Sequence, residues 1–127
     1  MTQEDKEVLI KDLCGRLPYG VICKIDNRCV KVEEINPFEE VITYDGWLSC
    51  GIDEDIKPYL RPLSSMTDEE HEEYRKYVKE VNGFTYNINC SDLVDWFNRK
   101  MFDYRGLIPK GLALEAKDGM YIKTYKN

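Results

Sequence analysis

The stretch LRPLSSMTDEEHEEY, residues 60 to 74, marks the point where the pattern of this sequence changes. Before it, short apolar runs are interrupted by proline and glycine, which is typical of strands and tight turns. Thr67 stands three residues before Glu70, and acidic residues fill the positions between them. That spacing predicts a capping box, in which the threonine and glutamate side chains each bind a free backbone N–H of the first helical turn. We therefore expect sheet-forming segments to give way to a helix here.

Three segments place apolar residues at helical spacing. The helices that we expect cover residues 3–14, 68–81 and 92–101. Thr2 and Ser91 are suited to cap the first and third helices, and Gly15 to end the first. The run of acids in the second helix is expected to form its solvated face, with Glu72 pairing with Lys76 one turn later.

Strands are indicated by short alternating runs that turn residues separate. Asp26-Asn27 predicts a tight hairpin, with Val21, Cys23 and Ile25 on one face. Further strands are expected at Val41–Tyr44, with Trp47 packing back onto the sheet, and from Phe84 onward; Asp118-Gly119 predicts a C-terminal hairpin. The fold class that follows is α+β in a single domain, residues 1–127: an N-terminal helix, an antiparallel β-meander, and two further helices with short strands.

Composition and charge narrow the possible surroundings and partners. The formal net charge is −6, divided into −10 over residues 1–95 and +4 over residues 96–127. The acidic part argues against non-specific nucleic-acid binding by the whole molecule. No apolar run approaches the ~18 residues that a membrane helix needs, and the acidic, amphipathic N-terminus does not resemble a signal peptide. We therefore expect a cytoplasmic protein with no membrane partner.

The residues that usually carry catalysis or hold cofactors are sparse. The five cysteines show no C-x-x-C spacing, so we expect free thiols, with Cys14, Cys23 and Cys29 as small buried apolar residues. The only histidine, His71, falls among glutamates on the second helix. No glycine-rich phosphate loop, hydrolase elbow or calcium loop is present, and Asp53-Glu54-Asp55 is interpreted as a surface turn. We therefore predict no catalytic residue, no cofactor and no metal site.

The segment WFNRKMFDYRGLIPKG is the most suggestive part of the chain. Aromatic and basic residues interleave in it: Trp96, Arg99, Lys100, Tyr104, Arg105 and Lys110. Aromatic rings that stack on bases, beside cations that follow phosphates, are the components of a single-strand-binding surface. The same residues are also typical of a buried helix face with basic residues near its C-terminus. We treat these six residues as a possible interaction surface.

The segments DLCGRLPYGV, KPYLRPLSSMTDEE and FDYRGLIPKGLALEAKDGMY resemble parts of small uncharacterised proteins of gut anaerobic bacteria and their phages and mobile elements. The resemblance implies a bacterial or phage cytoplasm and an accessory role, without an activity. The function that we expect is a non-catalytic accessory protein that binds another protein. The alternatives are a nucleic-acid-binding module that uses the basic, aromatic C-terminal third, and a small enzyme.

Overall fold

The structure is a computed structural model that describes residues 1–53, 55–81, 84–87 and 90–121, with only the backbone of residues 79–81, 84–87 and 90. The helices are α1 (Gln3–Arg16), α2 (Asp68–Tyr74) and α3 (Cys90–Lys100), and short 3-10 turns lie at Leu17–Tyr19 and Leu63–Ser65. The strands are β1 (Ile22–Ile25), β2 (Arg28–Lys31), β3 (Glu34–Asn36), β4 (Val41–Tyr44), β5 (Leu48–Gly51), β6 (Lys57–Leu60), β7 (Val78–Val81), β8 (Phe84–Asn87) and β9 (Leu114–Glu115). The predicted α+β class is confirmed. Within the described ranges, no helix is long and apolar enough to cross a bilayer.

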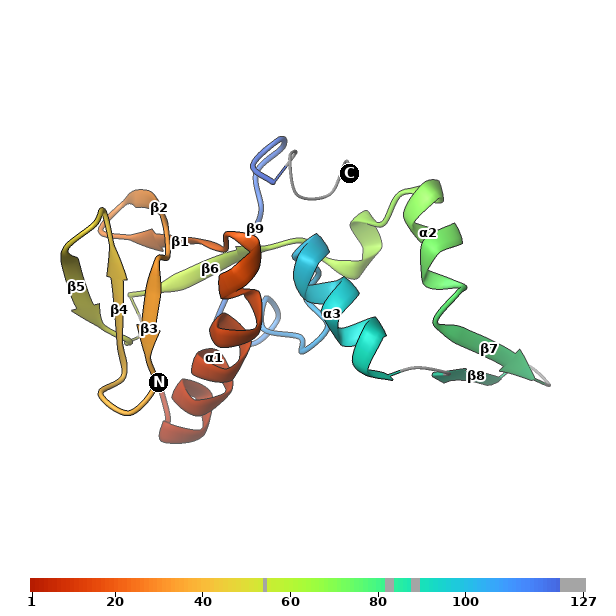
Figure 1. Ribbon diagram of the computed structural model, residues 1–127, viewed down its shortest axis with the longest axis horizontal. Helices are drawn as coiled ribbons and strands as arrows, with labels where there is room; N and C mark the ends of the chain where they lie inside the picture. Colours follow the sequence, from red (N-terminus) through yellow and green to blue (C-terminus); the bar gives the residue numbers. More distant parts are fainter. Residues whose placement is uncertain (54, 82–83, 88–89, 122–127) are drawn as a thin grey trace.

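The strands of the described residues form three separate sheets. A four-stranded sheet has the order β2-β1-β6-β9, the meander β3-β4-β5 forms a second sheet, and β7-β8 is a hairpin. Figure 1 shows the meander at one end of the long axis, α1 in the middle, and the β7-β8 hairpin at the other end. The expectation of one continuous meander is therefore corrected, because the chain leaves the first hairpin after Val32 and Glu33 hydrogen-bonds to Thr43 of β4 instead.

Turn chemistry explains the first hairpin. Asp26 and Asn27 have φ angles of 49° and 64°, the conformation that a two-residue hairpin turn requires. The predicted inward face, Val21, Cys23 and Ile25, is buried. At the other end of the chain, β9 pairs in parallel with β6, and the second arm of the expected C-terminal hairpin, residues 122–127, lies outside the described residues.

Helix α1 begins as predicted but ends later. The Thr2 hydroxyl accepts a hydrogen bond from the Asp5 backbone N–H at 3.0 Å. Gly15 does not end the helix, which continues to Arg16. Gly15 is instead where α3 approaches α1, since the Asn98 Nδ2 atom lies 2.9 Å from the point a Cβ would occupy. An alanine at this position would require the Asn98 side-chain amide to move.

Helix α2 has the predicted capping box but is much shorter than expected. Thr67 and Glu70 exchange the two predicted hydrogen bonds, at 3.0 and 3.2 Å. The helix stops at Tyr74, and Val78–Val81 forms β7, which contradicts the prediction of a helix to residue 81. The register Val81↔Phe84 encloses two residues, Asn and Gly, and this dipeptide between a β-branched and an aromatic residue favours a hairpin over a helix.

The other helical predictions hold only in part. Helix α3 begins at Cys90, so Ser91 lies within its first turn and does not cap it. Glu72 pairs with Arg75 and not with Lys76. The strand predicted from Phe84 is present as β8.

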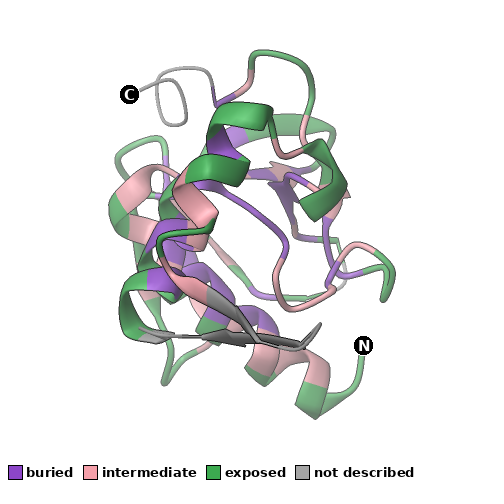
Figure 2. Cartoon of the chain, turned by 90° about the vertical axis from the view of Figure 1, so that its right-hand side faces the viewer, coloured by how far each residue is buried: buried purple, intermediate pink, exposed green. Residues whose placement is uncertain are grey.

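Two groups of buried side chains form the interior. The first packs α1 against the four-stranded sheet and the inner face of the meander, with Leu9, Leu13 and Ile42 fully buried. The second is aromatic and joins α2 to α3 around Leu93, Trp96 and Phe102. Figure 2 shows the buried positions running through the inner strands and the inward sides of the helices. The two groups meet where Met101 of the first precedes Phe102 of the second.

The acidic start of α2 is not solvated throughout, which corrects a second expectation. Glu70 is buried, and both of its carboxylate oxygens accept hydrogen bonds from the Arg61 guanidinium, at 2.7 and 2.8 Å. The Arg61 guanidinium carbon also lies 4.2 Å from the centroid of the Phe102 ring. Burial alone would raise the pKa of Glu70, but the hydrogen bonds from Arg61 and Thr67 outweigh burial and hold that pKa below its usual value.

This pair predicts a specific dependence of stability on pH. Because the pKa of Glu70 is lower in the folded state, its stabilisation is present above the unfolded-state pKa of about 4.3 and is lost as the pH falls through the folded-state pKa. Glu70→Gln should lower the free energy of unfolding by about 3 kcal/mol at pH near 7, because a buried arginine loses its counterion.

Urea unfolding across a pH series measures this effect. The difference between wild type and Glu70→Gln should shrink on acidification. Glu69→Gln is the matched control, because Glu69 is the exposed neighbour in the same helical turn, and it should change stability by less than about 0.5 kcal/mol. A difference between wild type and Glu70→Gln that stays constant with pH would contradict the ion pair.

Candidate functional site: an acidic sheet with two exposed aromatic rings

The six residues of the predicted interaction surface do not come together on the outside of the molecule. The Trp96 side chain is 1% exposed, and its Nε1–H donates to Glu73 Oε2 at 2.7 Å. Lys100 is 3% exposed, with its Nζ atom 3.8 Å from the same glutamate oxygen. The tryptophan and this lysine therefore belong to the interior of the molecule.

Tyr104 and Arg105 are half-buried and engaged with other side chains. The Tyr104 ring stacks on Phe97 at 5.3 Å between centroids. Arg105 donates from Nε to Asp12 at 3.2 Å and from Nη2 to the Tyr104 hydroxyl at 3.1 Å. Of the six residues, only Arg99 and Lys110 are exposed. The interleaved pattern reflects an aromatic cluster with cations packed around it, and its rings are not displayed for base stacking.

A different part of the chain concentrates charge at the surface. Residues 33–55 contain eight aspartates and glutamates and no lysine or arginine, a formal charge of −8. Since the whole chain carries −6, the remaining residues sum to +2. This segment forms the β3-β4-β5 meander and the connection to β6. We call residues 33–55 the acidic meander.

The acidic meander has one apolar and one polar face. Ile35, Ile42 and Leu48 pack against the first core. The opposite face is built from small and polar side chains, because the register places Glu34, Thr43 and Ser49 in one row across the three strands. In that row Glu34 and Ser49 are exposed and Thr43 is half-buried.

Phe38 stands at one end of the acidic meander, 95% exposed. The turn that carries it is fixed, because the Asn36 Oδ1 atom accepts hydrogen bonds from the backbone N–H groups of Phe38 and Glu39, at 3.0 and 3.1 Å. An asparagine that bonds the backbone two residues later defines a tight turn. Phe38 is therefore held away from the core by its own turn.

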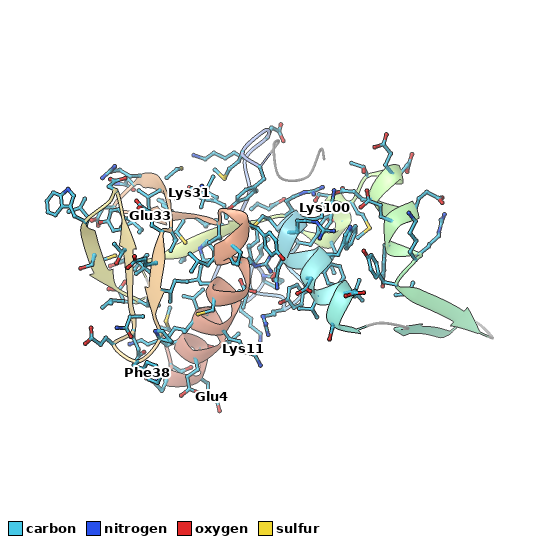
Figure 3. The ribbon with its side chains drawn as sticks, viewed as in Figure 1. Glu4, Lys11, Lys31, Glu33, Phe38 and Lys100 are labelled. Atoms are coloured by element: carbon cyan, nitrogen blue, oxygen red, sulfur yellow. The ribbon has the colours of Figure 1, made fainter. Side chains whose placement is uncertain are left out.

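Trp47 stands at the opposite end, 80% exposed, which contradicts the expectation that it packs onto the sheet. It follows Asp45 and Gly46, with φ angles of 51° and 81°, and the Gly46 N–H donates to Glu33 Oε1 at 2.7 Å. Figure 3 shows Glu33 and Phe38 at opposite ends of the meander. The sheet thus presents an aromatic ring at each end.

Two ion pairs partly neutralise this surface. Lys6 Nζ lies 3.6 Å from Glu40 Oε2, and Arg28 Nη2 lies 2.7 Å from Asp45 Oδ2. Both cations come from outside the acidic meander, Lys6 from α1 and Arg28 from β2. The two acids that they contact lie in the turns that carry Phe38 and Trp47. Exposed pairs of this kind contribute little to stability, and the remaining acids leave the surface strongly negative.

Over the residues whose positions are described, no group of three or more His, Cys, Asp or Glu side chains is placed to hold a metal ion. The absence of Lys and Arg from residues 33–55 was readable in the sequence and is the signal that could have located the site. The exposure of Phe38 and Trp47 was not readable, because aromatic residues between strands usually pack inward.

Comparison with known proteins gives no match to a family model, to a curated protein or to a solved structure. No activity or partner can therefore be transferred from a relative.

The charge around Trp47 predicts how quenchers will reach it. The chain has two tryptophans, and Trp96 is buried, so collisional quenching reports on Trp47. Negative surroundings concentrate cations and repel anions at low salt. When the quenching of each ion is expressed relative to that of neutral acrylamide, Cs⁺ should therefore quench the exposed fluorescence more efficiently than iodide does. Added salt should reduce this difference between the two ions. Trp47→Phe should remove the quenchable fraction; equal access for both ions would contradict the acidic setting.

Proposed function

We propose that this chain is a non-catalytic accessory protein, acting in a bacterial or phage cytoplasm, that binds a basic protein partner through the acidic meander. The observation that carries the proposal is the pair of exposed rings, Phe38 and Trp47, at the ends of the acidic meander, whose formal charge is −8. Tryptophan is enriched among the residues that dominate binding energy at protein interfaces. Burying either ring in a partner would recover the apolar burial energy, about 1.5–3 kcal/mol for a phenylalanine, that the fold leaves unused.

The charge selects the kind of partner. A surface with lysines and arginines around apolar pockets complements an acidic sheet with two aromatic anchors. Nucleic acid is disfavoured on this face by its phosphates, and a second copy of the chain would bring two acidic sheets together. The turn hydrogen bonds that fix Phe38 and Trp47 lower the entropic cost of binding, because the anchors are already in position.

The test combines capture with a direct affinity measurement. Tagged wild type, Phe38→Ser, Trp47→Ser and the control Leu63→Ser, which changes an apolar side chain that is 43% exposed, are used to capture proteins from nuclease-treated and untreated host lysate. We expect wild type and the control to retain one basic protein. Calorimetry with that purified protein should show a dissociation constant at least tenfold higher for each aromatic variant than for wild type, a loss of about 1.4 kcal/mol. The affinity of wild type for the same protein should fall as salt is added.

Other outcomes would overturn the proposal. Capture that is insensitive to both aromatic variants would exclude the acidic meander as the interface. Capture that depends on nucleic acid would favour the alternative function, a nucleic-acid-binding module that uses the C-terminal third. Micromolar binding of single-stranded oligonucleotides would favour it too, if that binding falls steeply with salt and disappears in the double variant Arg99→Ala, Arg105→Ala.

A further inference from the structure

The outer face of the four-stranded sheet carries a thiol among lysines. The hairpin register places Lys24 directly opposite Cys29, and the β1-β6 register places Lys24 opposite Lys57. Residues directly opposite each other in neighbouring strands project from the same face. Cys29 and the two lysines therefore form one row across β2, β1 and β6. Cys29 is exposed, so the expectation that it is buried is wrong, as it is for Cys14; of those three cysteines only Cys23 is buried.

Two further side chains surround the Cys29 sulfur. The Lys117 Nζ atom lies 3.8 Å from Sγ and 5.5 Å from the centroid of the Tyr59 ring. The Cys29 thiol donates to the Tyr59 hydroxyl oxygen over 3.6 Å. This hydrogen bond, together with burial, raises the pKa of Tyr59.

The segment that brings Lys117 to this position is held in place. The buried Tyr121 hydroxyl accepts from the Ile22 backbone N–H at 2.9 Å and donates to the Tyr59 carbonyl at 2.8 Å. These bonds fix residues 116–121 over β1 and β6, so Lys117 lies above Cys29 as part of the fold.

A cavity of about 500 Å³ opens beside the thiol. It is lined by Ile22, Cys29, Lys31, Lys117, Asp118, Gly119 and Met120. A second, polar cavity of about 420 Å³ on this sheet is lined by two lysines and two aspartates, with Asn27 and Leu114: Lys24, Lys57, Asp26 and Asp55. Among the described residues, none of these four lysines has a carboxylate within ion-pair distance, and Asp118 is the one acid that lines the first cavity. At the first cavity Lys31 and Lys117 outnumber Asp118, so positive charge is available there to a ligand.

We propose that Cys29 is a nucleophilic thiol that forms a mixed disulfide with small anionic disulfides bound in the adjacent cavity. The Cys29 thiolate attacks one sulfur of the ligand, the ligand S–S bond breaks as the new bond forms, and the departing thiolate takes up a proton. Cys29 is oxidised and half of the ligand is reduced, so no further oxidant is needed. Lys117, whose Nζ atom lies 3.8 Å from the sulfur, and Lys31 attract the anionic ligand to the thiol. The Cys29 thiol and the cavity beside it include no residue of the acidic meander, so the inference does not rest on the proposed function.

The test uses the full-length protein and two disulfides of opposite charge. Dithiobis(nitrobenzoate) carries two carboxylates, and cystamine carries two ammonium groups. Each is added at limiting concentration, and peptide mapping by mass spectrometry reports which thiol is modified. Cys14 is the internal control, because it is also exposed but lies on α1. We expect the anionic reagent to modify Cys29 about tenfold faster than Cys14, and cystamine to lose that preference.

Two lysine variants separate the site from general exposure. Lys117→Gln removes an exposed side chain and should slow the anionic reagent at Cys29 about fivefold, the effect of one charge at ~4 Å in water-like surroundings. Lys76→Gln, an exposed lysine beyond α2, should leave the rate unchanged. Circular dichroism confirms that both variants fold. Equal rates at Cys14 and Cys29, or a rate at Cys29 that is unaffected by Lys117→Gln, would overturn the proposal.

Discussion

Two buried arginines that converge on Phe102 hold the molecule together. Arg61 covers the Phe102 ring and binds Glu70 through two hydrogen bonds. Arg16, fully buried in α1, binds Asp12 through two hydrogen bonds and donates to the Phe102 carbonyl at 2.7 Å. One residue thus connects α1, β6, α2 and the segment after α3. Removing one partner of such a buried ion pair strongly destabilises the fold, because it leaves a buried charge unpaired. The two cores are joined through charge as well as through apolar contact.

The division of charge on the surface follows from the sequence and not from what the interior buries. Among the described residues, the interior holds three cations and three acids, so their formal charges cancel: Arg16, Arg61, Lys100, Asp12, Glu70 and Asp103. The acidic meander is negative because residues 33–55 contain no lysine or arginine. The hairpin and sheet registers place Lys24 and Lys57 in one row with Cys29.

Helix caps and tight turns could be predicted from the sequence, whereas contacts between residues far apart in the chain could not. The caps at Thr2 and Thr67 and the hairpin at Asp26-Asn27 depend on residues within four positions of one another, and all three are present. The burial of Glu70 depends on Arg61, which only the folded chain brings to it. The same limit applies to the candidate sites: the hairpin register already pairs Lys24 with Cys29, but Lys117 reaches that thiol from 88 residues away.

If the arginine pairs join the two cores, the whole described fold should unfold as one unit. In Trp47→Phe, tryptophan fluorescence reports only on Trp96 in the aromatic core, whereas far-ultraviolet circular dichroism reports on all helices and strands. Urea unfolding of this variant, followed by both probes, tests the claim most directly. We predict transitions with the same midpoint and slope, as for a two-state domain. A fluorescence transition that is complete at lower urea than the circular dichroism transition would show that the aromatic core unfolds independently and would contradict this account.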